Sequence, residues 1–372
     1  MKAGNPHGLS RHARAIAACF ALFAIVLLAG CRGASPTPVE SATPTAPLPT
    51  REPTMAPSFS PTSTATPSPS IIIYKSIDLE EERPWIVSLS SNAKYIAVVT
   101  ENETNIYELN YDPPELKKII KLPVPGTKVL DIYISNDGQY VATVLNDIDV
   151  WNVSNGQKLY TLKMGEVRGV AFSPNSKILA ATSCYSLKVW DLTAQKELIS
   201  WIPERKEGGR CTIGAHTPGV WLSDRMIAIN RYEDVIIWHF DSDKGPISLE
   251  LKGSRSVAIS PDEQLIAISP GETIEIVGIS NKEYQKTINV PNVSELWWAT
   301  RLLFSPDGRL LVALDSDEKS LKIFDVENWN ELYDLKDKII IDLSFSHDGN
   351  FLVLATLKEN EKKIKIELLK TR

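Results

Sequence analysis

The residues that could carry chemistry in this chain are few and widely spaced. Of its five histidines, only His216, His239 and His347 lie beyond the first 31 residues. None of them belongs to an H-E-x-x-H motif or lies near a cysteine pair at zinc spacing. The sequence also lacks a G-x-S-x-G motif and a glycine-rich phosphate loop. We therefore expect no enzymatic activity, no metal and no cofactor.

The most reactive candidate is Cys31, which follows Leu28-Ala29-Gly30 at the end of an apolar run. The run covers the 15 residues from 15 to 29. At 1.5 Å per residue such a run spans about 22 Å, less than the roughly 30 Å of a bilayer core. With the basic residues ahead of it, the run is typical of a signal peptide, which we assign to residues 1–30. Either a lipoprotein signal or an ordinary secretory signal that contains a cysteine by chance would have such a run.

The sequence Leu28-Ala29-Gly30-Cys31 resembles the lipobox of bacterial lipoproteins. This resemblance implies cleavage before Cys31, acylation of its sulfur and its nitrogen, and attachment to a cell membrane or an outer membrane on the extracytoplasmic side. Acyl chains add about 0.8 kcal/mol per buried methylene, so two or three of them hold a protein far better than one. The sequence leaves open whether the host cell has one membrane or two.

A linker and an acidic domain follow the cysteine. Serine, threonine and proline supply 25 of the 39 residues from 32 to 70. The few apolar residues that remain in this stretch cannot form a hydrophobic core. We predict that residues 31–70 form a lipidated, disordered tether and that 71–372 form a globular domain. This domain holds 35 basic and 44 acidic residues and no cluster of Lys and Arg. Nucleic acid is therefore not an expected partner, and the domain should not adsorb to anionic lipid by itself.

A repeat of about 43 residues organises the globular part. The stretch FSPNSKILAATSCYSLKVWDL at 172–192 returns as FSPDGRLLVALDSDEKSLKIFDV at 304–326 and as ISPDEQLIAISPGETIEIVGI at 259–279. A serine in the turn marks six units, at Ser90, Ser135, Ser173, Ser260, Ser305 and Ser346. The gap of 87 residues between the third and fourth markers is twice the usual interval. It predicts a further unit, which we place at 219–240.

Each unit has the pattern of four short strands. Apolar residues alternate with polar ones before each marker, as Val170 and Phe172 do, and Asp-Gly or Pro-Asp turns follow. The turn residues Asp137, Asp307 and Asp348 resemble calcium ligands, but the glycine after each is what a tight hairpin requires. No segment is a convincing amphipathic helix. Seven such units predict an all-β, seven-bladed β-propeller with four-stranded antiparallel blades.

The predicted propeller resembles the WD-repeat family, or the similar TolB-like propellers of the bacterial envelope. Trp151, Trp190 and Trp238 occupy the family's third-strand position, and Asp191 follows the second of them. The family's Gly-His pair is absent, so we expect its buried His-Ser-Asp-Trp network to be absent too. The seventh unit lacks a fourth strand, and we predict that IIIYKSIDL at 71–79 supplies it and closes the ring.

Cys184 and Cys211 lie in connections that should emerge on the same face of the propeller. An extracytoplasmic location favours a disulfide between them, provided that their Cα atoms lie within about 7 Å. Two free thiols are the alternative. Mass spectrometry with and without reductant distinguishes the two states.

The longest connection between blades, at 201–221, is the candidate partner site. It contains Arg205, Arg210 and His216, and the connection before the sixth unit ends in Trp297 and Trp298. Long loops on a rigid scaffold often carry function, and Trp and Arg often anchor protein interfaces. The alternative is that the tryptophans pack between blades while the basic side chains are solvated.

These observations favour a membrane-tethered, extracytoplasmic propeller that binds a protein or peptide without catalysis, and we expect a monomer. The alternative is an envelope enzyme or a small-ligand-binding propeller that uses the central channel. Ala171, Ala258 and Ser344 on the inner strands are small, which favours packing over a channel site. The fold alone does not decide between the two functions.

Overall fold

The computed structural model of the chain describes most of the region from 71 to 371, all of it within one compact unit, Pro69–Arg372. Described are residues 71–79, 84, 86–124, 129–183, 185–202, 220–231, 234–240, 245–251, 256–270, 273–289, 301–315, 320–336, 338–358 and 363–371. Outside the described residues lie the predicted signal peptide and tether with Cys31, and also Cys184, Arg205, Arg210, Cys211, His216, Trp297 and Trp298.

The described elements are 28 β-strands, as the alternation of apolar and polar residues predicts. They form seven sheets of four antiparallel strands, which confirms the all-β, seven-bladed propeller. No helix that could cross a membrane occurs in the part of the chain that the structure describes.

The strands of the first four blades are β2 (Ile86–Leu89), β3 (Tyr95–Val99), β4 (Thr104–Tyr111) and β5 (Pro114–Leu122); β6 (Asp131–Ile134), β7 (Tyr140–Val144), β8 (Ile148–Asn152) and β9 (Lys158–Leu162); β10 (Gly169–Phe172), β11 (Ile178–Thr182), β12 (Leu187–Asp191) and β13 (Lys196–Trp201); and β14 (Val220–Leu222), β15 (Met226–Arg231), β16 (Asp234–His239) and β17 (Ile247–Ser248). Those of blades 5 to 7 are β18 (Val257–Ile259), β19 (Leu265–Ile268), β20 (Thr273–Gly278) and β21 (Tyr284–Asn289); β22 (Arg301–Phe304), β23 (Leu310–Leu314), β24 (Leu321–Asp325) and β25 (Glu331–Leu335); and β26 (Ile339–Phe345), β27 (Phe351–Lys358), β28 (Lys363–Lys370) and β1 (Ile72–Asp78). The fourth blade is the unit predicted from the doubled interval.

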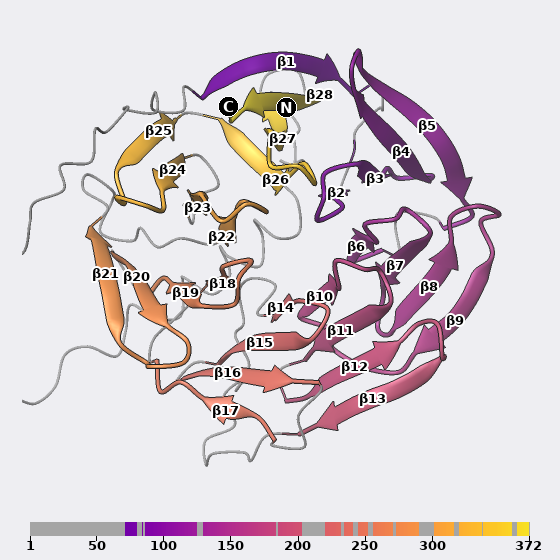
Figure 1. Cartoon of the computed structure of the whole chain (residues 1–372). Coiled ribbons are helices and arrows are strands. Elements are labelled where there is room, and N and C mark those ends of the chain that lie inside the picture. Colours follow the sequence, from indigo (N-terminus) through magenta and orange to yellow (C-terminus); the bar gives the residue numbers. More distant parts are fainter. Residues whose placement is uncertain are drawn as a thin grey trace, which may run out of the picture. The chain divides into compact units, whose positions relative to one another are not determined.

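The first strand of each blade is the innermost one (Figure 1). These strands surround the axis of the ring, and β2 contacts β6 on one side and β26 on the other. Each innermost strand ends at its hairpin turn, so these turns share one face, which we call the turn face. The connections between successive blades emerge on the opposite face, the loop face.

The hydrophobic core is divided among the interfaces between blades. Between blades 7 and 1, Leu89 and Ile96 pack with Val353 and Ile366, and each is at most 6% exposed. Burying one such side chain contributes roughly 1.5–3 kcal/mol. Each of the seven interfaces has a cluster of this kind, so the ring is held by contacts between neighbours.

The marker serines build the turns of the turn face. In six blades the serine Oγ donates to the Asp or Asn two residues later, at 2.5–2.8 Å. It also accepts the backbone N–H five residues later, at 2.9–3.0 Å. In three of these turns the residue after the aspartate is a glycine with φ between 67° and 71°. This confirms that the Asp-Gly pairs are hairpin turns.

Gly138 is the turn glycine with the least space, because an added Cβ would lie 2.5 Å from the Tyr95 ring of blade 1. We expect Gly138→Ala to lower the free energy of unfolding by about 2–4 kcal/mol, from backbone strain and the displaced ring. Gly165→Ala is the matched control, since Gly165 has φ 69° but nothing within 4 Å of the added Cβ. It should lose only about 1–2 kcal/mol. Urea denaturation measures both losses, and equal losses would contradict the packing argument.

β1 closes the ring as the outermost strand of blade 7. It pairs antiparallel with β28, and Ile72 lies opposite Lys370. Beside it, the Tyr111 ring of blade 1 stacks on Phe351 of blade 7 with centroids 5.1 Å apart. The prediction that residues 71–79 complete the last blade is confirmed.

The outermost strand carries one extra residue in six of the seven blades, as far as they are described. The register with the third strand shifts at the equivalent position each time. The extra residues are Tyr74, Ile119, Leu159, Leu198, Gln285 and Leu332. Such bulges twist an open strand edge and disfavour edge-to-edge pairing of two rings. β1 shares this bulge and therefore has the geometry of a regular outer strand.

Candidate functional site

The loop face carries both connections in which the sequence predicts a partner site. β13 ends at Trp201 and β14 begins at Val220, while β21 ends at Asn289 and β22 begins at Arg301. All four strand ends lie on the loop face, because each blade is entered and left on the side opposite its first hairpin turn. The candidate residues between these ends lie outside the described residues, so their role stays a prediction, as does the disulfide.

Polar side chains gather around the axis on the loop-face side of the innermost strands. Along these strands, residues buried between blades, such as Ile132, alternate with partly covered ones, such as Asp131 and Tyr133. Tyr133 also packs against the hydrophobic cluster between blades 2 and 3. The position four residues before the marker serine is Asp131 in blade 2, Arg301 in blade 6 and Asp342 in blade 7.

Asp342 joins three blades. Its carboxylate pairs with the guanidinium of Arg301 in blade 6, and its Oδ2 accepts the backbone N–H of Leu89 in blade 1 at 2.6 Å. Its Oδ1 also accepts the N–H of Leu343 at 2.8 Å. The Asp342 side chain is only 9% exposed, so water cannot readily replace these partners. Asp342 therefore links blades 6, 7 and 1 at the point where the ring closes.

Asp131 and Tyr133 form the other part of this axial cluster. The Tyr133 hydroxyl donates to Asp131 Oδ2 at 2.8 Å, and the Ile132 N–H donates to Oδ1 at the same distance. Burial raises the pKa of Tyr133 well above its ordinary value of 10. The charges of Asp131 and Asp342 raise this pKa further, while Arg301 lowers it. The four ionisable side chains thus interact although they come from three blades.

The raised pKa of Tyr133 makes the stability of the ring depend on alkaline pH. The folded state holds the Tyr133 proton more tightly than the unfolded chain does. The resulting stabilisation is complete below about pH 10 and is lost as the pH rises above that value. We expect the melting temperature to fall from about pH 9 to 11, and to fall less in Tyr133→Phe. Calorimetry across this interval measures both slopes, and identical slopes would contradict the assignment.

The small inner-strand residues Ala171, Ala258 and Ser344 pack as expected: Ala258 and Ser344 are buried, and Ala171 lies against the cluster between blades 3 and 4. These three residues lie two residues before their markers. The polar residues Asp131 and Arg301, which the sequence analysis did not single out, lie four residues before theirs. Side chains alternate along a strand with a period of two, so one position relative to the marker serine can be compared in every blade. A comparison of the position four residues before the marker could have revealed Asp131 and Arg301.

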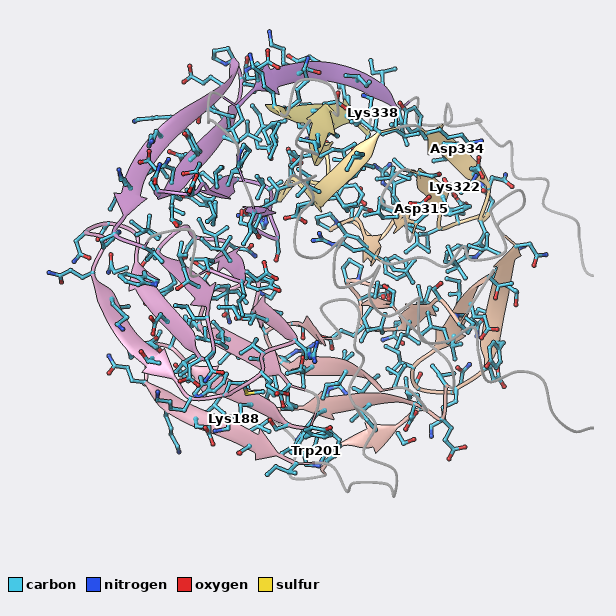
Figure 2. The ribbon with its side chains drawn as sticks, turned by 180° about the vertical axis from the view of Figure 1, so that it is seen from behind. Lys188, Trp201, Asp315, Lys322, Asp334 and Lys338 are labelled. Atoms are coloured by element: carbon cyan, nitrogen blue, oxygen red, sulfur yellow. The ribbon has the colours of Figure 1, made fainter. Side chains whose placement is uncertain are left out.

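Two lysines of blades 6 and 7 are paired within the protein: Lys322 on β24, and Lys338, which directly precedes β26 (Figure 2). Lys322 is 7% exposed, and its Nζ lies 2.7 Å from Glu331 and 3.1 Å from Asp334. Burial acts to lower the pKa of Lys322, but hydrogen bonds to these two carboxylates raise it above its ordinary value. Lys338 Nζ lies 2.6 Å from Glu367. These ion pairs stabilise their blades, and because both lysines are paired, neither is available to an anionic partner.

A side-chain hydrogen bond joins the third and second strands of blade 2. Trp151 Nε1 donates to Thr143 Oγ1 at 2.9 Å. This bond includes no histidine, and the chain has no Gly-His pair, so the absence of the His-Ser-Asp-Trp network stays a prediction. Within the described ranges, no three His, Cys, Asp or Glu side chains converge on a metal-sized site.

Comparison with known protein families finds a match within blades 2 and 3. Residues 156–191 match the family described as "WD domain, G-beta repeat". The matched segment runs from the outermost strand of blade 2 to the third strand of blade 3 and ends at Asp191, directly after Trp190.

Several similar proteins cover only part of the chain. Apoptotic protease-activating factor 1 of Danio rerio is 26% identical over 216 residues, which are 54% of this chain and 16% of that protein. Small ribosomal subunit protein RACK1 of Caenorhabditis elegans is 35% identical over 111 residues, 28% of this chain and 34% of the relative. The protein of the same name from Medicago sativa is 26% identical over 119 residues, 28% of this chain and 37% of the relative. The chain therefore spans little more than a third of these relatives at most.

Proposed function

We propose that this protein is a non-catalytic scaffold that binds a protein or peptide on its loop face. The observation that carries the proposal is the closed ring, which matches a WD repeat over residues 156–191 and brings the ends of the two candidate connections to one face. The similarity to RACK1, whose name assigns it to a small ribosomal subunit, also supports a role in an assembly rather than in a reaction. We place the partner against Arg205, Arg210, His216, Trp297 and Trp298.

We also propose that lipid on Cys31 holds the scaffold at the extracytoplasmic side of a membrane. The Leu28-Ala29-Gly30-Cys31 sequence and the apolar run before it support this part of the proposal. Residues 32–70 would then give the ring a reach of at most roughly 120 Å, at 3.1 Å per residue. Metabolic labelling with an alkyne fatty acid should label the wild-type protein and not Cys31→Ala. Equal labelling of both proteins would rule out lipid on this cysteine.

Crosslinking and capture from membranes of the native host test the scaffold function. We expect the full chain to capture a defined partner, and a variant lacking residues 203–217 to lose it. The deletion lies between β13 and β14, so the melting temperature of the variant should stay close to that of the wild type and serves as the control. Capture of the same partners after the deletion would place the binding site elsewhere.

The axial cluster favours a second candidate, a small polar ligand or substrate at the axis. Asp131, Tyr133 and Arg301 are polar, partly exposed and electrostatically coupled there. Turnover by the purified protein on a broad panel of hydrolase substrates, lost in Asp131→Asn, would support this candidate. Activity that is unchanged in this variant would exclude the axial cluster as its source.

A further inference from the structure

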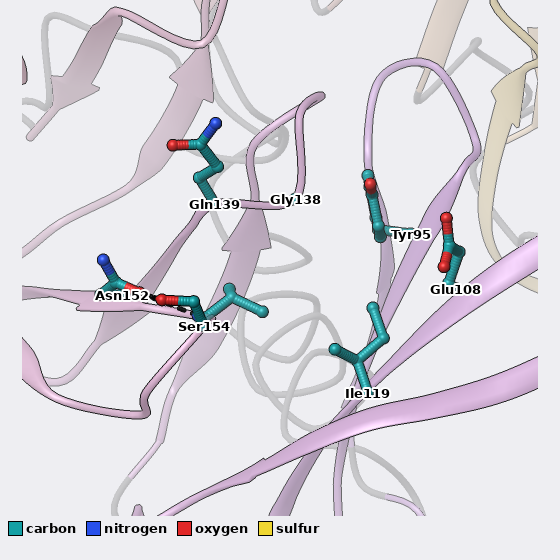
Figure 3. Close-up of a pocket in the computed structure, with 8 residues that line it drawn as sticks. Tyr95, Glu108, Ile119, Gly138, Gln139, Asn152 and Ser154 are labelled. Atoms are coloured by element: carbon teal, nitrogen blue, oxygen red, sulfur yellow. Dashed lines mark hydrogen bonds between the residues drawn. The ribbon is translucent and has the colours of Figure 1, made fainter.

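A groove between blades 1 and 2 lies apart from the axial cluster, toward the turn face (Figure 3). Its volume is about 320 Å³. Blade 1 contributes Tyr95, Glu108 and Ile119, and blade 2 contributes the turns at 138–139 and 152–154. The groove is a candidate binding site because its rim combines polar and apolar side chains from two rigid blades.

The walls of the groove are already fixed in place. The Tyr95 ring lies directly on the backbone of Gly138, where no Cβ would fit. The backbone N–H of Val153 donates to the carbonyl of Gln139 at 2.9 Å. Asn152 Oδ1 accepts the N–H and the hydroxyl of Ser154 at 2.8 and 2.6 Å. A ligand would therefore meet a preformed rim and would lose little free energy in ordering it.

The groove presents no unbalanced charge. Its carboxylate belongs to Glu108, whose Oε1 lies 3.2 Å from Lys94 Nζ. The other polar side chains are neutral, and the Gln139 amide and Asn152 Nδ2 have no hydrogen-bond partner among the described residues. A side-chain amide offers both a donor and an acceptor, as a peptide group does. The rim is therefore complementary to an uncharged ligand that contains peptide groups.

Ile119 supplies the apolar contact. It is the extra residue of β5, and 40% of it is exposed. Figure 3 shows its side chain directed into the space between Glu108 and Ser154. A bulge of this kind turns a side chain out of the regular alternation. Ile119 thus points into the groove, where an aliphatic side chain of a ligand could cover it.

We propose that this groove binds an extended, uncharged peptide segment with one aliphatic side chain. The aliphatic side chain packs on Ile119 beside Tyr95, and the flanking peptide groups bond to Gln139 and Asn152. A charged segment fits less well, because Lys94 already neutralises Glu108. This inference rests on the proposed peptide-binding function and assigns the protein a second site, separate from the loop face.

A phage-displayed library of random peptides, selected on the full chain, tests the inference. Selected peptides are then titrated by fluorescence polarisation. We expect Ile119→Arg to weaken binding at least about tenfold, and Gln139→Ala severalfold. Leu159→Arg is the matched control: Leu159 is the extra residue of the next outer strand, is 41% exposed and lies outside the groove. It should bind the peptides as the wild type does.

Three results would overturn the inference. They are a library that yields no enriched peptide, peptides that bind Ile119→Arg as tightly as the wild type, and an oligosaccharide array on which a glycan rather than a peptide requires Ile119. The variant lacking 203–217 separates this site from the loop-face site. It should keep the groove peptide while it loses the native partner. Failure of the groove peptide alone leaves the loop-face proposal intact.

Discussion

Replacement of Asp342 by alanine should lower the free energy of unfolding by about 3 kcal/mol. The variant leaves Arg301 without its partner and leaves the N–H groups of Leu89 and Leu343 without an acceptor. Removing one member of a buried ion pair costs roughly 3–5 kcal/mol. We expect the lower end of this range because the Arg301 side chain is 34% exposed and can be partly rehydrated.

Urea denaturation of Asp342→Ala measures this loss, and Glu103→Ala is the matched control. Glu103 also belongs to an ion pair, with Lys121 at 2.7 Å, but that lysine is 59% exposed. A surface pair of this kind contributes less than about 1 kcal/mol. If the two variants unfold at the same urea concentration, the contacts of Asp342 do not stabilise the closed ring.

Loss of β1 should abolish cooperative unfolding. A chain that begins at Glu81 lacks the partner of β28 and leaves that strand edge open. It also lacks Ile71 and Leu79, which are 7% and 3% exposed and lie in the cores on the two sides of blade 7. The total loss approaches the roughly 5–15 kcal/mol that stabilises a typical domain. The shortened ring should therefore be open or unfolded.

Thermal unfolding of two truncated chains tests this prediction. A chain that begins at Ile71 keeps β1 and should melt as the full chain does, because all seven interfaces remain. A chain that begins at Glu81 should show no sharp transition and should bind a dye for exposed apolar surface. A shared melting temperature for the two would mean that the ring does not depend on its N-terminal strand.

Most of the fold could be predicted from the sequence because its repeats are local. The alternation before each marker serine fixes the innermost strands, and the interval of about 43 residues fixes the number of blades. The contact between Leu89 and Asp342 spans 253 residues, and no local pattern reports such a contact. The bulges also escaped prediction, because one extra residue in an exposed strand such as β5 leaves the apolar pattern of the other strands unchanged.

The site was predicted less well, for two physical reasons. The candidate connections were chosen for length and composition, and neither property fixes the position of a side chain. The axial residues Asp131 and Arg301 lie at the first position of a strand, where a sequence-based boundary is least certain. The groove beside Ile119 depends on a bulge and on the approach of two blades, so it emerges only from tertiary structure.

We propose that the propeller itself is the binding module. The most direct test is a calorimetric titration of the partner captured from native membranes into two proteins, the full chain and residues 69–372. We predict one partner per ring, the same affinity for both proteins, and no binding to the variant lacking 203–217. Binding to the full chain but not to residues 69–372 would place the binding function in the first 68 residues and would contradict the claim.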